Sequence, residues 1–139
     1  MSCVFCEIAA GEAEASILHE DDRVYAVMDI QPVTPGHLMV IPKRHAAYLA
    51  DLEDEDSDAM LRVARRAAVA LRASGLRCEG VNLFLADGEA AGQDVFHVHL
   101  HVLPRFEGDG FGLRLPPDYS VRPRAELEAA AAKIREAWR

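Results

Sequence analysis

The sequence predicts one α+β domain, with an antiparallel sheet of about five strands and two longer helices. Segments typical of strands are mixed with segments of helical periodicity along the chain. Several strand-like segments are joined by turns too short for a parallel crossover, which requires about a dozen residues. Half of the 139 residues are apolar, so the chain can bury one core, and we expect a single domain over residues 1–139.

The first part of the chain predicts a short helix and three strands. Gly11 suits the C-cap of the helix, because glycine readily adopts the left-handed conformation that ends many helices. An acidic turn joins the first two strands, and a loop with two prolines and a glycine precedes the third. The expected helix covers residues 4–10, and the expected strands cover residues 16–19, 23–29 and 38–41.

A long amphipathic helix is predicted next. Asp54 or Ser57 is expected to cap its start, and Gly75 to end it. The acidic residues between positions 53 and 58 are expected to form a solvated first turn, which the helix dipole favours. Apolar residues recur at the spacing of one helix face. They are Met60, Ala64, Ala67, Ala68 and Leu71.

The remaining chain predicts two more strands and a second long helix. Residues 81–86 form a strand, residues 87–94 form a mobile loop with two glycines, and residues 95–103 form the fifth strand. Residues 107–119 are rich in Gly and Pro and are expected to wrap the surface. The second helix covers residues 125–139, and one side of it carries Leu127, Ala131, Ile134 and Trp138.

Charge and hydropathy exclude several classes of partner. The formal net charge is −8, and phosphate backbones bind clustered Lys and Arg, so we expect no nucleic-acid polymer as partner. A small nucleotide in a local pocket stays compatible with this charge. No apolar run has the length of a membrane span, and the N-terminus lacks the features of a signal peptide. We expect a cytoplasmic protein with no membrane partner.

Two of the three cysteines have the spacing of a metal-binding pair. Cys3 and Cys6 form a C-x-x-C motif, which in a reducing compartment favours a metal site over a disulfide. Tetrahedral zinc needs two further ligands, so the alternative is a reduced pair without metal. Cys78 has no obvious partner and is expected to be a small core or surface residue.

Three histidines at alternate positions are the most informative feature of the chain. A strand places residues i, i+2 and i+4 on one face, so His97, His99 and His101 would line one surface. Neighbouring imidazole stems would lie roughly 6.6 Å apart, so this spacing argues against ligation of one metal by all three rings. Packing explains the pattern poorly, because buried imidazoles need hydrogen-bond partners. The opposite, buried face would consist of Phe96, Val98, Leu100 and Val102.

This triad resembles the signature of the histidine triad family of nucleotide hydrolases and transferases. Further segments resemble the family in the same order across residues 3–112, most closely its small phosphoramidate-hydrolase branch and bacterial relatives. The resemblance implies the family's α+β fold and a homodimer whose sheet continues across both subunits. Residues 113–139 would be a C-terminal extension and helix. The similar segments are residues 3–8, 25–30, 35–43, 91–93 and 104–105.

By this resemblance His99 is the nucleophile. It would attack the α-phosphorus of a nucleotide and form a covalent nucleotidyl-histidine, from which water releases a nucleoside monophosphate. A neutral imidazole can do this without a metal or a strong base, provided that its tautomer is fixed. His101 would stabilise the non-bridging oxygens, Gln93 would bind the leaving-group oxygen or orient the phosphate, and His37 would border the groove. Backbone N–H groups of residues 92–95 would form part of a phosphate cradle.

The resemblance also implies a pocket for a purine nucleotide such as AMP or an adenosine phosphoramidate. Asp29 would accept hydrogen bonds from both ribose hydroxyls. Four apolar residues would wall the base, with core packing as the equal alternative. These four are Phe5, Ile8, Val27 and Ile30. The other residues expected to contact the nucleotide are Gln93, Asp94, Val95, His99 and His101.

Some bacterial members of the family hold zinc with a Cys-Cys-His-His set. By this resemblance His45 and His97 would join Cys3 and Cys6 in binding a zinc ion. The role of this zinc would be structural, because all four coordination positions would be taken by protein ligands and none would be open. The site would pin the N-terminal helix to the sheet and fix the ring of His97 beside the nucleophile.

The chain departs from the family pattern at three positions. Family members often carry Asn where this chain has Ala86 and Asp87, and Ala86 cannot donate a hydrogen bond from its side chain. Asp94 replaces a Ser near the leaving group. A carboxylate there would repel a polyphosphate and favour a cationic group, so we expect a preference for phosphoramidates.

Other functions fit the sequence less well. Within the family, the main alternative is a dinucleoside polyphosphate hydrolase, and a phosphorylase or guanylyl transferase suits this length less. Outside it, a metalloprotein could use His97 and His99 as a chelating pair, but it would need a third ligand and an open position. A nucleotide-binding scaffold protein with weak activity would have the same sequence features.

Overall fold

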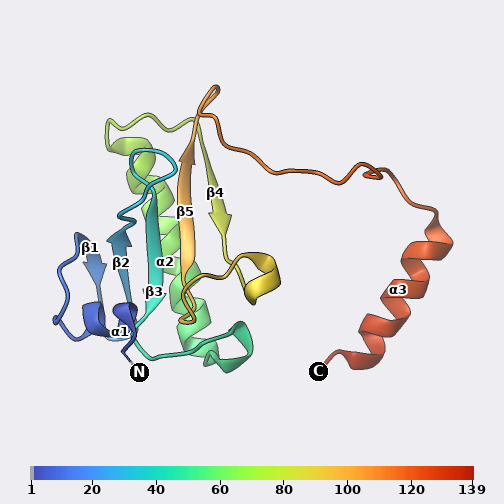
Figure 1. The fold of residues 1–139 in the computed structure, drawn as a ribbon, viewed down its shortest axis with the longest axis horizontal. Coiled ribbons are helices and arrows are strands. Elements are labelled where there is room, and N and C mark those ends of the chain that lie inside the picture. The colour runs from blue at the N-terminus through green and yellow to red at the C-terminus, as the bar shows by residue number, and fades with distance from the viewer. Residues whose placement is uncertain (1) are drawn as a thin grey trace.

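A five-stranded antiparallel sheet forms the body of the protein, as the sequence predicted (Figure 1). The computed structural model describes residues 2–139. The strands are β1 (Ile17–Glu20), β2 (Val24–Met28), β3 (Leu38–Pro42), β4 (Gly80–Phe84) and β5 (Leu100–Arg105). They lie in the order β1-β2-β3-β5-β4, so β1 and β4 are the two edges of the sheet.

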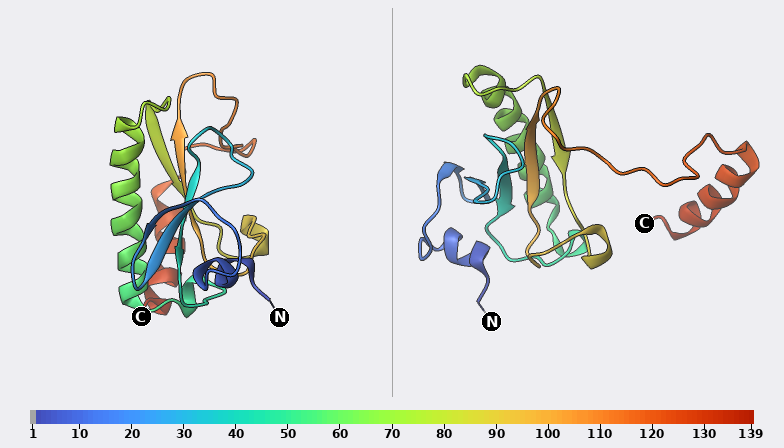
Figure 2. Two further views of the ribbon diagram at one scale, coloured as in Figure 1. Left: turned by 90° about the vertical axis from the view of Figure 1, so that its left-hand side faces the viewer. Right: turned by 45° about the horizontal axis from the view of Figure 1, so that its top comes forward.

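Helices cover both faces of this sheet (Figure 2). The long helix α2 (Asp54–Ala73) packs on one face against β2, β3 and β5, and the short helix α1 (Val4–Ala9) lies on the other. A third helix, α3 (Arg124–Ala137), stands apart from the body. Single turns of 3₁₀ helix cover Leu49–Asp51 and Glu89–Ala91. Within residues 2–139, no helix is both long enough and apolar enough to cross a membrane.

Each face of the sheet has its own core. Between α2 and the sheet lies the larger core, which includes Val40, Val63 and Val102. Under α1 lies a smaller one. There the buried Tyr25 hydroxyl on β2 donates a 2.7 Å hydrogen bond to the Phe5 carbonyl, which ties α1 to the sheet. Residues of the smaller core are Phe5, Tyr25, Val27, Met39 and Ile41.

The strand register sets the position of His101. Met39 on β3 and Phe84 on β4 both lie opposite His101 on β5. Residues directly opposite each other in a sheet point to the same face. Because Met39 belongs to the core under α1, the His101 side chain lies on the α1 face as well.

The fifth strand is shorter than the sequence predicted, which corrects the expected range 95–103. It begins at Leu100, so His97 and His99 precede it. Its partner β3 ends at Pro42, which has no N–H to extend the ladder, and the N–H of Val98 instead donates to the Ala46 carbonyl at 2.8 Å. The alternation of side chains between the two faces of the sheet therefore stops before Leu100. As a result, Phe96 is 41% exposed instead of buried as predicted.

The start of α2 also corrects two expectations. The helix begins at Asp54 with Glu53 at the N-cap position, and no side chain caps it, so neither Asp54 nor Ser57 has the predicted role. The first turn is not wholly solvated, because Asp56 is buried and accepts a 2.9 Å hydrogen bond from Arg23. The expected end at Gly75 is close, since Ser74 is the C-cap and Gly75 follows with a positive φ.

The C-terminal segment does not wrap the body, contrary to the sequence-based expectation. Residues 111–123 run away from the sheet without regular structure and lead to α3 beyond the β4 edge (Figures 1 and 2). No residue of α3 is buried. The apolar side of this helix therefore lacks a partner within the described chain.

We expect Tyr25→Phe to lower the free energy of unfolding by about 1–2 kcal/mol, because the buried Phe5 carbonyl loses its donor. Urea unfolding followed by circular dichroism measures the change. Tyr119→Phe is the matched control, since Tyr119 is exposed and the same change should stay within about 0.5 kcal/mol. Equal effects of the two substitutions would contradict this role of Tyr25.

Candidate active site and metal site

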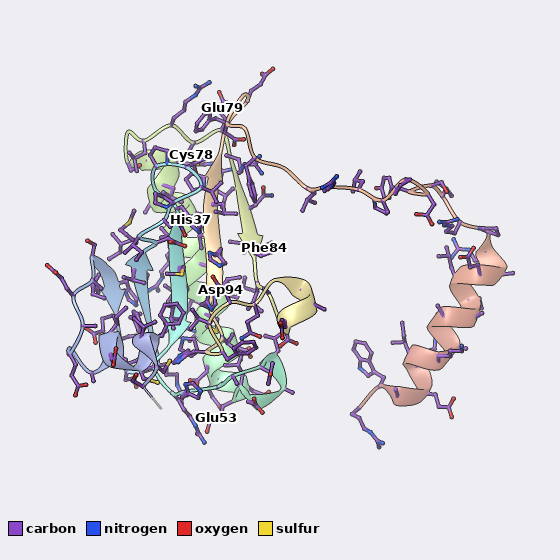
Figure 3. The ribbon with its side chains drawn as sticks, in the orientation of Figure 1. His37, Glu53, Cys78, Glu79, Phe84 and Asp94 are labelled. Atoms are coloured by element: carbon purple, nitrogen blue, oxygen red, sulfur yellow. The ribbon has the colours of Figure 1, made fainter. Side chains whose placement is uncertain are left out.

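Three histidines gather on the face of the sheet that α1 covers. His37 lies just before β3, His99 just before β5, and His101 within β5. The ring centroids of His37 and His99 each lie 5.0 Å from that of His101. Figure 3 marks their surroundings with labels on His37, on Phe84 of β4 and on Asp94 of the loop before β5. The structure thus brings together the histidines that the sequence predicted to act together.

The tautomer of His99 follows from one hydrogen bond. Its Nδ1 lies 2.8 Å from the carbonyl oxygen of His97, which can only accept. In the neutral ring Nδ1 therefore carries the hydrogen, and Nε2 keeps its lone pair. The residue is buried, and its ring packs edge-on against Phe5. The His99 ring is thus held in one orientation, with the lone pair of Nε2 free.

The tautomer of His101 follows from a chain of two hydrogen bonds. The N–H of Val33 donates to His37 Nδ1 at 3.0 Å, so the hydrogen of the neutral His37 ring is on Nε2. His37 Nε2 lies 2.8 Å from His101 Nδ1 and donates to it. The remaining hydrogen of His101 is then on Nε2. His101 can therefore donate a hydrogen bond beside the His99 ring.

Burial keeps these rings neutral. Burial, together with His99 and His37, lowers the pKa of His101 to about 4, although the charges of Asp29 and Asp94 act in the opposite direction. Burial also lowers the pKa of His37, against the charge of Asp29. Both rings are neutral at pH 7, which is the state that the hydrogen-bond chain requires.

Asp29 lies at the end of β2 beside this chain. Its Oδ2 is 3.4 Å from His37 Nε2 and 3.7 Å from His101 Nδ1. Its Oδ1 accepts a 2.8 Å hydrogen bond from the N–H of Gln31. The carboxylate is thus oriented by the backbone, and Oδ2 has room for another donor.

Gln93 holds the loop before β5 and leaves no donor free for a ligand. Its Nε2 donates to the carbonyls of Ala47 at 2.7 Å and Val95 at 3.1 Å, and its Oε1 accepts from the N–H of Gly88. This geometry corrects the expectation that Gln93 donates to the leaving group. It makes Gln93 a positioning residue.

The expected phosphate cradle is narrower than residues 92–95. The N–H groups of Gly92 and Gln93 donate to the carbonyls of Glu89 and Gly88. Within residues 2–139, the N–H groups of Asp94 and Val95 make no hydrogen bond. The Asp94 side chain is 83% exposed, and its Oδ1 lies 3.7 Å from His99 Nε2. The segment next to His99 therefore has two free N–H donors and one carboxylate.

The four expected base-pocket residues do not form one wall. Phe5 and Val27 are buried in the small core, where the core alternative holds, and Ile8 packs against it. Ile30 is 98% exposed.

Two of the three departures from the family pattern lie in or beside the loop before β5. Ala86 is buried, and Asp87 accepts a hydrogen bond from the N–H of Leu49 at 3.0 Å. Asp87 therefore has a role in the loop structure.

Cys3, Cys6, His45 and His97 come together at the N-terminus of α1, as predicted. Their ligand atoms lie within 4.8 Å of one another. Cys3 Sγ is 3.4 Å from His97 Nδ1, Cys6 Sγ is 3.4 Å from His45 Nδ1, and the two Nδ1 atoms are 3.2 Å apart. Tetrahedral zinc with these donors requires separations of about 3.3–3.8 Å.

The tautomer of His97 also fits a metal ligand. Its Nε2 donates to the Pro42 carbonyl at 2.7 Å, so Nδ1 carries the lone pair that faces the two thiols. His97 is fully buried, and burial lowers its pKa. The residues present fit a tetrahedral metal. Cys78 is separate from them and donates to the Gly80 carbonyl.

Sequence reasoning missed the groups that orient the histidines. These are backbone atoms of Val33, Pro42 and His97, which have no signature in a sequence. It also missed Phe84, whose ring centroid lies 6.0 Å from that of His101. Phe84 and Asn82 are two residues apart on β4 and so point to the same face, but no feature of the sequence around Phe84 indicates that it lies beside the histidines.

Comparison with known proteins identifies relatives of the whole chain. The HIT domain family matches residues 10–108. A zinc-bound histidine triad family protein from Mycobacterium smegmatis is 45% identical, with a TM-score of 0.77 over 99% of this chain and 98% of that one. A HIT family protein from Bacillus anthracis is 37% identical, with a TM-score of 0.89 over 99% of this chain and 97% of that one. A histidine triad nucleotide-binding protein from Candida albicans is 30% identical, with a TM-score of 0.87 over 98% and 96%.

We expect His101 to be neutral at pH 7, with its hydrogen on Nε2, and to titrate near pH 4. Two-dimensional ¹H–¹⁵N NMR of the imidazole rings over pH 3–8 distinguishes the tautomers and gives the midpoint. Asp29→Asn should lower the midpoint further, because Asp29 favours the charged ring. A midpoint above 6, or a hydrogen on Nδ1, would contradict the hydrogen-bond chain.

Proposed function

Because the chain belongs to the HIT family, we propose that it is a nucleotide hydrolase that cleaves the P–N bond of nucleoside phosphoramidates through a covalent nucleotidyl-histidine. One observation carries this proposal. The lone pair on His99 Nε2 and the N–H on His101 Nε2 belong to rings whose centroids are 5.0 Å apart, and backbone groups fix both tautomers. A nucleophile beside a donor for the developing charge is the arrangement that phosphoryl transfer requires.

The first step forms a bond from His99 Nε2 to the α-phosphorus and breaks the P–N bond. The leaving amine takes a proton from solvent. The modified imidazole keeps its hydrogen on Nδ1 and becomes cationic, and the His97 carbonyl, which accepts that hydrogen at 2.8 Å, stabilises it. His101 and the free N–H groups of Asp94 and Val95 stabilise the non-bridging oxygens.

The second step returns the enzyme to its starting state. Water attacks the phosphorus, the bond to His99 breaks, and nucleoside monophosphate leaves. The water loses one proton to solvent, so His99 regains the lone pair on Nε2. No step requires a metal at the phosphate, because neutral imidazole is already a competent nucleophile.

Asp94 selects the leaving group. Its exposed carboxylate lies 3.7 Å from His99 Nε2, so it contributes a negative charge close to the reacting phosphorus. A negative charge there attracts an ammonium and repels a polyphosphate. The same charge stabilises the cationic intermediate at His99. Dinucleoside polyphosphates are therefore the poorer substrates in this proposal.

Asp29 binds the ribose of a purine nucleotide such as AMP. Its Oδ2 has room for a hydroxyl donor, since the backbone bond from Gln31 uses Oδ1. The exposed Ile30 covers one face of the base when the nucleotide is bound, and Ile8 borders the site. Phe5 and Val27 support these residues from the core.

Zinc bound by Cys3, Cys6, His45 and His97 has a structural role. It cross-links α1 to the segment that leads into the active site. His97 contributes its Nδ1 to the metal, and its carbonyl fixes the His99 ring. The zinc-bound relative from Mycobacterium smegmatis, at 45% identity, supports this assignment.

The protein acts as a homodimer joined at the free edge of β4. This strand is at the end of the sheet, and its Leu83 and Phe84 are exposed. An unpaired edge offers a row of backbone donors and acceptors to a second copy. Pairing there would continue the sheet across both subunits.

We expect His99→Asn to abolish the covalent intermediate and to lower turnover more than about a thousandfold. Intact mass is measured after rapid quenching with adenosine phosphoramidate and EDTA, without strong acid, which would cleave a P–N bond to histidine. His19→Asn, on β1 and outside the site, is the control and should keep the adduct. Turnover of His99→Asn at the rate of the wild type would contradict the mechanism.

Asp94→Ser should shift the ratio of kcat/KM for a diadenosine polyphosphate over an adenosine phosphoramidate upward by about tenfold, since one repulsive charge is removed. Both rates are measured at low and high salt, because a charge effect weakens with screening. An unchanged ratio would refute the role of Asp94 in leaving-group choice and would leave the His99 mechanism intact.

Purified protein should contain about one zinc ion per chain, as measured by inductively coupled plasma mass spectrometry. Cys6→Ser should lose it, and Cys78→Ser should retain it, because Cys78 lies outside the cluster. Loss of zinc should also lower the thermal midpoint, since α1 loses its link to His97. Equal zinc contents in the two variants would contradict the ligand assignment.

A further inference from the structure

A cavity on the α2 face of the sheet has no function in the proposed reaction. It measures about 360 Å³ and lies on the opposite face from the histidine site. Helix α2 packs mainly on β2, β3 and β5, so the end of the sheet near β1 is left uncovered. Leu18 on β1 is 55% exposed there. The apolar lining includes Leu18, Met28, Leu38, Val63, Ala67 and Leu71.

Helix α3 has an apolar face without a partner. Leu127, Ile134 and Trp138 recur at intervals of seven and four residues and are all exposed. A 14-residue helix alone in water is marginally stable, so it needs packing on another surface. Within residues 2–139, that surface is not supplied by the body from which α3 projects (Figure 1).

The projecting position of α3 is shared with a solved relative. The Bacillus anthracis structure matches 99% of this chain with a TM-score of 0.89. Residues 113–139 are about a fifth of the 139 residues, so the body alone could not give this score. The relative's chain therefore holds its C-terminal segment in a similar place. Contact with a second copy is one arrangement that can hold a projecting helix in the same place in two proteins.

We propose that α3 of one copy packs into the cavity between α2 and β1–β2 of a second copy, and that the exchange is reciprocal. This step builds on the proposed pairing of two copies at β4. A two-fold axis normal to the joined sheet places both α2 helices on the same side. Beyond the β4 edge, helix α3 lies toward the side of the sheet that α2 covers (Figure 2). In the joined sheet the partner's uncovered β1 end lies about five strand spacings, or roughly 24 Å, beyond β4. The irregular residues 111–123 can span up to about 43 Å when extended, so α3 can reach that end over the partner's sheet.

The chemistry of the two surfaces agrees with this contact. The α3 face is apolar along Leu127 and Ile134, Ala131 between them allows close approach, and Trp138 follows at the C-cap. The cavity is lined mainly by apolar side chains of the size that interdigitate with such a face, with His19, Arg66 and Ser74 among the lining residues. The ion pair of Glu128 with Arg135 lies at the border of the apolar face and remains in solvent. Docking would cover β1 and complete the second layer over the sheet.

Docking of α3 on its own body is the competing arrangement. The cavity of the same chain lies toward β1, whereas the segment 111–123 leads away past β4, at the opposite edge. Helix α3 would have to turn back across its own α2 to reach that cavity. The two arrangements differ in which copy a cross-link from α3 modifies.

Photo-cross-linking between two tagged copies tests the exchange. One copy has p-benzoylphenylalanine in place of Ile134, and the other is the unmodified chain with a different tag. The two are co-expressed, the mixed pair is purified through both tags, and it is irradiated without nucleotide. We expect a covalent pair, in which mass spectrometry joins the peptide around residue 134 to peptides of residues 17–28 or 63–76 of the other copy.

The control has the same photo-reactive residue in place of Glu136, on the opposite side of α3, and should give at least tenfold less of this product. Cross-links within one copy, cross-links to other surfaces, no cross-link from position 134, or no mixed pair would each overturn the proposal. The readout needs no substrate. Its failure is therefore distinct from failure of the proposed hydrolase activity, which the His99→Asn experiment addresses.

Discussion

The candidate site depends on hydrogen bonds that each fix one nitrogen of a histidine ring to a backbone group. The Pro42 carbonyl holds His97, the His97 carbonyl holds His99, and the Val33 N–H holds His37. Each bond determines where the hydrogen of a neutral ring lies, and so whether the other nitrogen accepts or donates. Three rings of one chemical type thereby present different groups: His97 a lone pair toward the two thiols, His99 a free lone pair on Nε2, and His37 an N–H toward His101.

The end of the pairing between β3 and β5, at Val40 and Leu100, makes this arrangement possible. Had the two strands stayed paired through Pro42, the carbonyls of Pro42 and His97 would be available to the ladder instead of orienting imidazoles. Because the pairing stops, the chain before Leu100 is free to fold around His97 and His99. The local loss of strand structure is therefore part of how the site is built.

The N-terminal helix stabilises this irregular segment from outside the sheet. Phe5 packs on the rings of His97 and His99, and its carbonyl accepts the hydrogen bond from the buried Tyr25 hydroxyl. Cys3 and Cys6 lie at the start of the same helix, beside His97. Core packing, a buried hydrogen bond and the cysteine–histidine cluster thus restrain one short segment, which allows a non-repetitive backbone to hold the candidate site in one geometry.

The sequence by itself determined the fold class, the positions of the five strands to within a few residues, and the residue types that carry chemistry. Periodicity and alternation are local properties, so they located α2 and the histidines that gather near His101. Only the tertiary structure decided that Gln93 is used internally, that Asp56 is buried against Arg23, and that Ile30 is exposed. These depend on contacts between distant segments. The tautomers of His97, His99 and His37 could not be predicted from the sequence either. They are fixed by backbone carbonyls and N–H groups, which nearly every residue has, so only the fold decides which of these groups contacts a histidine ring.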